Sequence, residues 1–136
     1  MSLFVDTSVW SLAFRRDPSD TCAQVTKLTR ALEEGDTILT TGLVLQELLQ
    51  GFSGPNARML ILDHFSAVPL LAPDRDDYIE AATLRNDCGR AGVQAGTVDA
   101  LIAQLCIRHS LTLLSTDRDF EHIAKHSELK VWQAGV

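Results

Sequence analysis

The sequence lacks the features that mark several large classes of proteins. Its three cysteines, Cys22, Cys88 and Cys106, are widely spaced and form no Cys-x-x-Cys pair, so a disulfide framework or a cysteine zinc site is not expected. No apolar run approaches the roughly 18 to 20 residues that a membrane helix needs. No basic region precedes the first apolar residues, so we expect no signal peptide. These absences predict a cytoplasmic protein with no membrane partner.

An excess of basic residues is also missing. The 136 residues carry 12 Lys and Arg against 18 Asp and Glu, for a formal net charge of −6. This balance speaks against a broad basic face that grips nucleic acid. It does not exclude a nuclease, because acidic residues that bind a divalent cation account for part of the negative charge. The length and the 46 % hydrophobic content predict a single globular domain over residues 1–136.

Apolar strand-like runs alternate with helical patterns through the chain, with no internal repeat. This alternation predicts an α/β protein in which a mainly parallel sheet lies between helical layers. Proline in the run 68–71 predicts an edge strand or an extended linker. The other expected strands are 2–5, 37–40, 111–115 and 130–132. The expected helices are 8–14, 20–34 with Ser19 or Asp20 as cap, 41–52, 56–65, 74–90, 97–109 capped by Thr97, and one from Asp117 or Asp119 to about 126.

Four carboxylates fall where strands are expected to end or helices to begin: Asp6, Glu47, Asp99 and Asp117. Parallel strands direct their carboxyl ends into one crevice. Several carboxylates there repel each other unless a divalent cation lies between them. The four histidines show no clear ligand pattern, so an all-oxygen site for Mg²⁺ or Mn²⁺ is expected. An open metal site of this kind favours hydrolytic chemistry.

Each acid also has a purely structural explanation. Asp6 fits a helix cap, and Asp117 or Asp119 fits another. Glu47 fits a solvated helix face, and Asp99 gains from the dipole at a helix start. Two aspartates after one strand exceed what capping requires, so Asp119 is a further candidate ligand. We expect other acids in loops or at polar helix positions to be solvated: Asp17, Asp20, Glu33, Glu34, Asp74, Asp76, Asp77 and Asp87.

The ordered set of acidic motifs resembles the PIN-domain ribonucleases, specifically the VapC toxins of type II toxin–antitoxin pairs. The resemblance covers essentially the whole chain and is carried by Phe4-Val5-Asp6-Thr7-Ser8, by Leu45-Gln46-Glu47-Leu48, by residues 97–103 around Asp99, and by Leu113-Leu114-Ser115-Thr116-Asp117-Arg118-Asp119-Phe120. It implies a three-layer α/β/α fold and Mg²⁺- or Mn²⁺-dependent endonucleolytic cleavage of cellular RNA (tRNA, rRNA or mRNA) that inhibits translation and growth. The implied catalytic residues are Asp6, Glu47, Asp99 and Asp117, the metal ligands Asp6, Asp99, Asp117 and Asp119, and the supporting residues Thr7, Ser8 and Thr116.

The resemblance also implies partners. These are an RNA substrate, a cognate VapB-like antitoxin and a second copy of the chain, giving a homodimer and, with antitoxin, a heterotetramer or larger assembly. Candidate phosphate contacts are Arg15, Arg16, Arg90 and Arg118.

Two rival interpretations remain. A haloacid-dehalogenase-type or receiver-type phosphotransfer domain fits poorly, because Asp6-Thr7-Ser8 is not Asp-x-Asp and no receiver-type residues are clear. The alternative is a catalytically silent PIN-like protein-interaction module.

Overall fold

A central parallel sheet organises the fold. The computed structural model describes residues 1–15 and 22–135. Within them the sheet has the strand order β3-β2-β1-β4-β5, with every neighbouring pair parallel. The strands are β1 (Ser2–Val5), β2 (Thr37–Thr41), β3 (Leu70–Leu71), β4 (Thr112–Leu114) and β5 (Lys130–Val131). The proline-containing run 68–71 therefore supplies an edge strand, as predicted.

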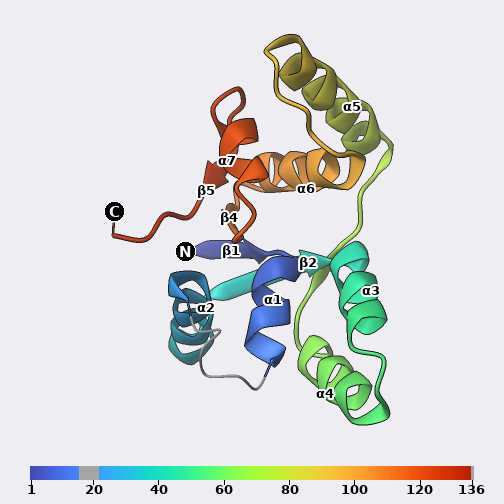
Figure 1. The fold of residues 1–136 in the computed structure, drawn as a ribbon, viewed down its shortest axis with the longest axis vertical. Helices are drawn as coiled ribbons and strands as arrows, with labels where there is room; N and C mark the ends of the chain where they lie inside the picture. The colour runs from blue at the N-terminus through green and yellow to red at the C-terminus, as the bar shows by residue number, and fades with distance from the viewer. Residues whose placement is uncertain (16–21, 136) are drawn as a thin grey trace.

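Helices cover both faces of this sheet. In Figure 1, α1 to α4 lie on one side of the sheet and α5 to α7 on the other, which confirms the predicted three-layer α/β/α architecture. The helices are α1 (Thr7–Phe14), α2 (Ala23–Glu34), α3 (Gly42–Gly51), α4 (Pro55–Phe65), α5 (Arg75–Arg90), α6 (Thr97–Arg108) and α7 (Asp119–Ala124). Ser19 and Asp20, the predicted caps of α2, lie outside the described residues, and the prediction is wrong because Cys22 is the cap. None of the described helices is both long and apolar enough to span a bilayer.

Local sequence explains most helix and strand boundaries. Leu3, Phe4 and Val5 are fully buried, as expected for a parallel strand covered on both faces. Gly35 ends α2 in the left-handed conformation with φ of 72°, which a residue with a Cβ adopts at a cost. The prediction that Thr97 caps α6 is wrong. Gly96 is the cap and Thr97 is the first helical residue.

The position of β1 creates a crevice at the carboxyl edge of the sheet. The chain builds β2 and β3 on one side of β1 and later returns to place β4 and β5 on the other. The strand order thus reverses between β1 and β4, and ligand sites of open α/β sheets lie at such a switch point. The backbone N–H of Asp6 donates to the Leu114 carbonyl at 3.2 Å, so the ends of these two strands are held side by side.

The end of β1 is also fixed from the α1 side of the sheet. The Val5 carbonyl accepts hydrogen bonds from Thr40 Oγ1 and Trp10 Nε1, both at 3.1 Å. The Trp10 indole is buried and packs on Phe65, with ring centroids 4.9 Å apart, and on Phe14. This aromatic group links α1 to α4, so the residue after Val5 starts from a rigid backbone.

One expected surface acid is instead buried. Asp77 on α5 is 0 % exposed and pairs with the Arg108 guanidinium of α6. It also forms a capping box with Asp74, in which each side chain accepts the other residue's backbone N–H, at 2.9 and 3.0 Å. The prediction that Asp77 is solvated is therefore wrong. Its partner lies 31 residues away in the sequence, beyond what local patterns reveal.

Candidate active site

Asp6 stands at the end of β1 and caps α1. Its Oδ1 accepts from the Ser8 backbone N–H at 3.1 Å and from Ser8 Oγ at 2.6 Å. Its Oδ2 accepts from Ser115 Oγ at 2.8 Å. The side chain is only 6 % exposed. Burial raises the pKa of Asp6, and the hydrogen bonds from Ser8 and Ser115 oppose that rise. Asp6 is thus both a cap and an oriented carboxylate at the crevice.

Two serine hydroxyls connect the segments that follow β1 and β4. Ser115 Oγ donates to Asp6 and accepts the Asp117 backbone N–H at 3.0 Å. Ser8 Oγ donates to Asp6 and accepts the Thr116 backbone N–H at 3.0 Å. The predicted supporting residue Ser8 is therefore in contact with the acids. Thr116 joins through its backbone, and Thr7 is half-buried in the first turn of α1.

Ser115 was missed as a site residue in the sequence. It is buried at the end of β4 and contacts both strand-end acids through one hydroxyl. A signal was present, because a polar residue directly after the apolar run 113–114 lies at the same sheet edge as Asp6. The family resemblance implied instead the neighbouring Thr116, which is exposed.

Asp117 and Asp119 lie on the turn that leads from β4 into α7. Asp117 Oδ1 accepts the Asp119 backbone N–H at 2.9 Å, and Asp119 is the first residue of α7. Both side chains are exposed. Asp117 thus shapes the turn with one oxygen, and both carboxylates face solvent at the crevice.

Asp99, in the first turn of α6, completes a group of three carboxylates. Ligand oxygens of Asp99, Asp117 and Asp119 all lie within 4.8 Å of one another. Burial raises the pKa of Asp99 to about 6, and the negative charges of Asp117, Asp119, Asp6 and Glu47 add to the effect. The other four acids named in the sequence therefore all act electrostatically on the Asp99 carboxylate.

Glu47 lies on α3, on the other side of the sheet from α6 (Figure 1), and acts electrostatically on Asp99. It lies midway along α3 and is exposed. Its carboxylate accepts no hydrogen bond within the described part of the chain, which leaves both oxygens available to water or a ligand. The structure thus brings Glu47 near Asp99 without building it into the hydroxyl network that holds Asp6.

The oxygen donors fit a hard divalent cation. Asp99, Asp117 and Asp119 offer carboxylates at close range, and Asp6 stands behind them. Clustered anions without other cations are the environment in which Mg²⁺ and Mn²⁺ bind. Burial first, and the neighbouring negative charges second, raise the pKa of Asp99, and a bound cation would oppose both effects.

The candidate phosphate-binding arginines are not equally placed. Arg118 lies between two site aspartates and is exposed. Arg15 follows the far end of α1, a helix of 8 residues, so it lies roughly 12 Å along the helix axis from the Asp6 cap. Arg16 lies outside the described residues. Arg90 ends α5 and pairs with Asp87 at 3.0 Å.

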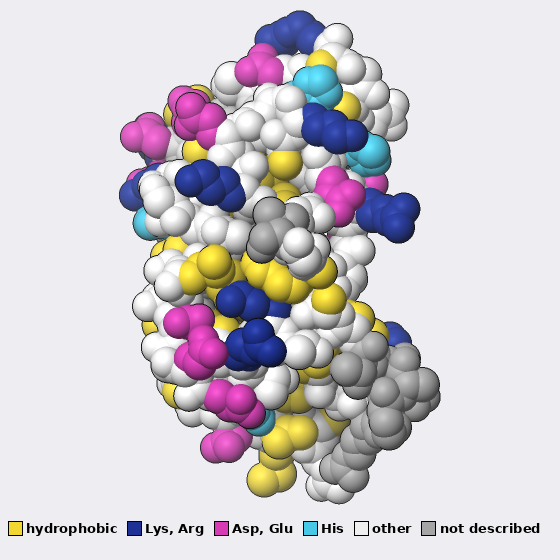
Figure 2. Space-filling view, turned by 90° about the vertical axis from the view of Figure 1, so that its left-hand side faces the viewer, with side chains coloured by type: hydrophobic (Ala, Val, Ile, Leu, Met, Phe, Trp, Pro, Cys, Tyr) yellow, Lys and Arg dark blue, Asp and Glu magenta, His cyan; other side chains and the backbone are white. Residues whose placement is uncertain are grey.

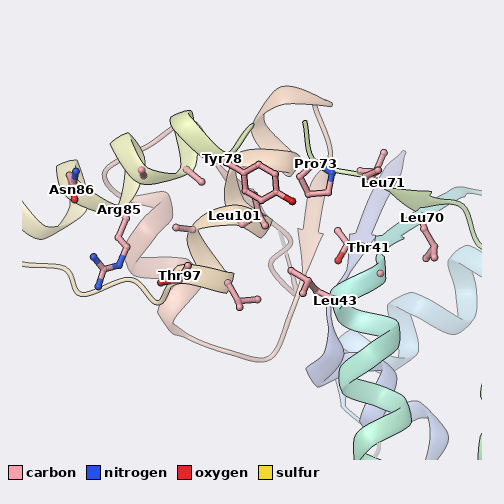
Figure 3. A pocket seen from close by; sticks show the side chains of 16 residues that line it. Thr41, Leu43, Leu70, Leu71, Pro73, Tyr78, Arg85, Asn86, Thr97 and Leu101 are labelled. Carbon is pink, nitrogen blue, oxygen red and sulfur yellow. The ribbon is translucent and has the colours of Figure 1, made fainter. Parts of the chain in front are cut away.

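An apolar cleft of about 740 Å³ opens beside the acids. Figure 3 shows Leu43 and Leu70 on one side of it and Tyr78 and Leu101 on the other. Tyr78 is 58 % exposed, and the buried Thr41 hydroxyl at the cleft has no hydrogen-bond partner among the described residues. The cleft therefore presents uncovered apolar surface next to the start of α6.

Comparison with known proteins finds relatives by sequence and by fold. The family model for the PIN domain matches residues 3–126. VapC ribonuclease Mb1587 of Mycobacterium bovis and ribonuclease VapC11 of Mycobacterium tuberculosis are each 30 % identical over 130 residues, covering 94 % of this chain and 96 % of the relative.

Solved structures share the fold at lower identity. The chain resembles VapBC2 from Rickettsia felis, bound to a DNA fragment from its promoter, with a TM-score of 0.75, 21 % identity and coverage of 97 % of this chain and 98 % of the other. It resembles VapBC-1 from nontypeable Haemophilus influenzae with a TM-score of 0.74, 17 % identity and 98 % coverage of both. Taken with the sequence relatives and the acidic crevice between β1 and β4, these matches show that the chain belongs to the PIN-domain family, in its VapC group.

Proposed function

We propose that this protein is a metal-dependent endoribonuclease and the toxin of a type II, VapBC-like toxin–antitoxin system. Its substrate is cellular RNA (tRNA, rRNA or mRNA), and cleavage inhibits translation and growth in the cytoplasm. The observation that carries the proposal is the convergence of Asp6, Glu47, Asp99, Asp117 and Asp119 on one crevice. Relatives named as VapC ribonucleases, 30 % identical over 94 % of the chain, support it. The complete acid set disfavours a catalytically silent interaction module.

Asp6, Asp99, Asp117 and Asp119 would hold the divalent ion, Mg²⁺ or Mn²⁺. The oxygens of Asp99, Asp117 and Asp119 lie within 4.8 Å of one another, and Asp6 acts electrostatically on Asp99 from the end of β1. When bound, such an ion lowers the pKa of water and neutralises charge that develops on phosphate oxygens. Ser8 and Ser115 hold the Asp6 carboxylate in one orientation, so the field at the crevice is preorganised.

Glu47 is the residue we assign to the attacking water. Its exposed carboxylate is not used by the described protein groups, so it can accept a proton from water as the oxygen attacks phosphorus. The new bond joins the water oxygen to phosphorus, the bond from phosphorus to the 3′ oxygen breaks, and the departing 3′ oxygen takes a proton from solvent water. The products carry a 5′-phosphate and a 3′-hydroxyl, and the 2′-hydroxyl is not the nucleophile.

Two exposed apolar surfaces support the proposed partners. On α4, Met59 is 70 % exposed, and Leu60 and Leu62 are also exposed; we assign this surface, with Leu32 on α2, to a VapB-like antitoxin. The cleft beside Tyr78 is assigned to a second copy of the chain, giving a homodimer and, with antitoxin, a heterotetramer or larger assembly. Exposed apolar patches of this kind commonly mark protein–protein contacts. Residues 1–136 would act as one PIN-like domain.

The test is cleavage of total cellular RNA by the antitoxin-free protein in Mg²⁺ or Mn²⁺. We expect discrete cuts that disappear with EDTA and with Asp6→Asn. Asparagine retains a capping oxygen, so this variant keeps the fold while losing the charge. Asp63→Asn on the exposed face of α4 is the matched control and should cleave like the parent protein.

Mapping the cut ends identifies the RNA and the chemistry together. A 5′-phosphate at each cut agrees with attack by water. No cleavage of any RNA by folded, metal-loaded protein, or equal cleavage by Asp6→Asn, contradicts the proposed function.

A further inference from the structure

RNA bound at the acidic crevice needs positive charges nearby that offset the repulsion between carboxylates and phosphates. Five carboxylates repel the phosphates that flank the scissile bond, and the chain carries a net charge of −6. Figure 2 shows that on one face of the molecule acidic and basic side chains are interspersed rather than separated by sign. An RNA strand would therefore gain most from cations placed close to the crevice.

A polar groove of about 690 Å³ lies next to the crevice, between the end of α5 and the segment 91–96 that leads into α6. We call it the α5–α6 groove. Its lining offers two guanidinium groups, Arg85 and Arg90, and two side-chain amides, Asn86 and Gln94. The other lining residues are small or apolar: Gly89, Val93, Ala95 and Gly96. No acidic side chain of the described residues lines it.

Arg85 is oriented by a hydrogen bond to the backbone of the segment 91–96. Its Nε donates to the Ala95 carbonyl at 2.9 Å, and Figure 3 shows the side chain extending from α5 toward the segment before Thr97. Among the described residues it forms no ion pair, so its terminal nitrogens remain available. An oriented guanidinium donates to phosphate oxygens through two parallel hydrogen bonds.

Arg90 is available at small cost. Its ion pair with Asp87 joins two side chains that are 71 % and 55 % exposed. Exposed pairs of this kind contribute little free energy because water screens them. A phosphate can therefore replace or share the Asp87 contact.

The groove adjoins the acidic crevice at two places. Val93 and Gln94 also line a smaller pocket of about 280 Å³ that includes Asp119 and His122. At the end of the same segment, a Cβ on Gly96 would lie 3.8 Å from Asp99 Oδ2. Asp119 and Asp99, two of the three clustered carboxylates, thus lie next to the groove, one at each of these places.

We propose that the α5–α6 groove binds the RNA strand next to the scissile phosphate. Arg85 and Arg90 contact its phosphates, and Asn86 and Gln94 donate to phosphate or 2′-hydroxyl oxygens, the groups by which proteins recognise RNA. This inference rests on the proposed ribonuclease function and names the part of the molecule that retains its substrate.

The first experiment measures binding of a fluorescent single-stranded RNA of mixed sequence in EDTA, where no cleavage occurs. Arg85→Gln combined with Arg90→Gln should weaken binding by about tenfold or more, as the loss of two charged hydrogen bonds predicts. The slope of log affinity against log salt should fall by about 1.4, or about 0.7 for each phosphate that is no longer neutralised. Arg30→Gln on α2, also an exposed arginine, is the matched control and should change neither quantity.

A second variant separates charge from loop support. Arg85→Lys removes the guanidinium bond to Ala95 but retains a positive charge, so it should bind RNA better than Arg85→Gln. Mn²⁺ titration of each variant should give the same affinity as the parent protein, since the residues assigned to the ion are carboxylates and neither arginine is one of them. Lost Mn²⁺ binding in the Gln variant would show a collapsed segment 91–96 and would overturn a direct role in RNA binding.

The outcomes distinguish the groove from the enzyme. If the parent protein cleaves RNA while the double variant binds RNA with unchanged affinity and salt slope, the groove proposal fails and the ribonuclease stands. If the parent cleaves nothing but the double variant loses RNA affinity, the groove stands and the ribonuclease fails. If the double variant binds RNA as the parent does but no longer binds a VapB-like antitoxin, the groove belongs to the protein partner and the proposal is overturned.

Discussion

The carboxylate of Asp99 gives the site a pH dependence with a definite sign. Its pKa is about 6 because burial and four nearby negative charges disfavour ionisation, whereas the unfolded chain titrates near 4. The folded metal-free protein therefore binds more protons than the unfolded one between these values. Its stability is highest below the unfolded pKa and is lost as pH rises through about 6.

Asp99→Asn removes this dependence. Melting in EDTA at several pH values from about 4.5 to 7.5 should show the parent protein falling in Tm relative to the variant as pH rises. At neutral pH the variant should be more stable by about 1 kcal/mol, while its Mn²⁺ affinity is reduced. A constant difference in Tm between parent and variant across this range would contradict the raised pKa of Asp99.

Ser115 is expected to matter through the two aspartates that its hydroxyl contacts. Ser115→Ala leaves Asp6 Oδ2 without its donor and the Asp117 N–H without its acceptor. Residues that orient ligands in this way typically contribute about 10- to 100-fold to activity or metal affinity. Single-turnover cleavage should fall by that factor, with a stability loss of about 1 to 2 kcal/mol.

Two substitutions check that the effect is positional. Ser115→Thr retains a hydroxyl and should recover much of the rate. Ser127→Ala removes a serine hydroxyl that bonds to the Ile123 carbonyl at 2.8 Å, away from the acids, and should leave the rate unchanged. A parent-like rate for Ser115→Ala would show that the hydroxyl does not position the acids.

At the scale of elements, the ion pair between Asp77 and Arg108 fastens α5 to α6. Arg108→Met leaves a buried carboxylate without its cation, and we expect a loss of about 2 kcal/mol, less than for a fully buried pair because Arg108 is half-exposed. Arg90→Met breaks the exposed pair with Asp87 and should change stability by about 0.5 kcal/mol or less. Urea unfolding measures both.

The contribution of the Asp77–Arg108 ion pair to stability depends on pH with the opposite sign to that of Asp99. Burial alone raises the pKa of Asp77, but the Asp74 backbone N–H and the Arg108 guanidinium lower it on balance. Its contribution is therefore present above the unfolded pKa near 4 and is lost as pH falls through the lower folded value. The stability difference between parent and Arg108→Met should shrink on acidification, and a constant difference would contradict this origin.

Local sequence predicted the alternation of elements well because its signals are local. Apolar runs such as Leu3 to Val5, and residues that interrupt helices such as Gly35 and Pro55, determine the structure only of the few residues around them. The strand-end positions of Asp6 and Asp117 followed from the same signals, since parallel strands share one carboxyl edge. These parts of the fold and site needed no knowledge of distant contacts.

The parts that the sequence did not predict depend on distant partners. Asp77 is buried only because Arg108 reaches it from another helix, and Ser115 matters because β1 lies beside β4. Glu47 was grouped with the acids at strand ends and helix starts, but it lies midway along α3, where helical periodicity fits a solvated residue equally well. The sequence thus defined the elements more fully than the contacts between their ends.

For the whole molecule, the apolar cleft predicts self-association. Tyr78→Asp places a charge in the cleft and should convert a homodimer to a monomer, because burying an unpaired carboxylate at an interface is costly. Ile79→Asp is the matched control, since Ile79 is similarly exposed but does not line the cleft. Sedimentation velocity at micromolar concentration measures both. A monomeric parent protein, or equal dissociation by the two variants, would assign the cleft another role.

The packing of Trp10 makes the protein its own optical reporter. The indole is buried between α1 and α4 and donates to the carbonyl that precedes Asp6, whereas the other tryptophan, Trp132, is partly exposed near the C-terminal end. With Trp132 replaced by phenylalanine, all tryptophan fluorescence would come from a fluorophore bonded to the backbone beside the acidic crevice. Emission and quenching of that single fluorophore would then follow ion loading, unfolding and antitoxin docking without any attached dye.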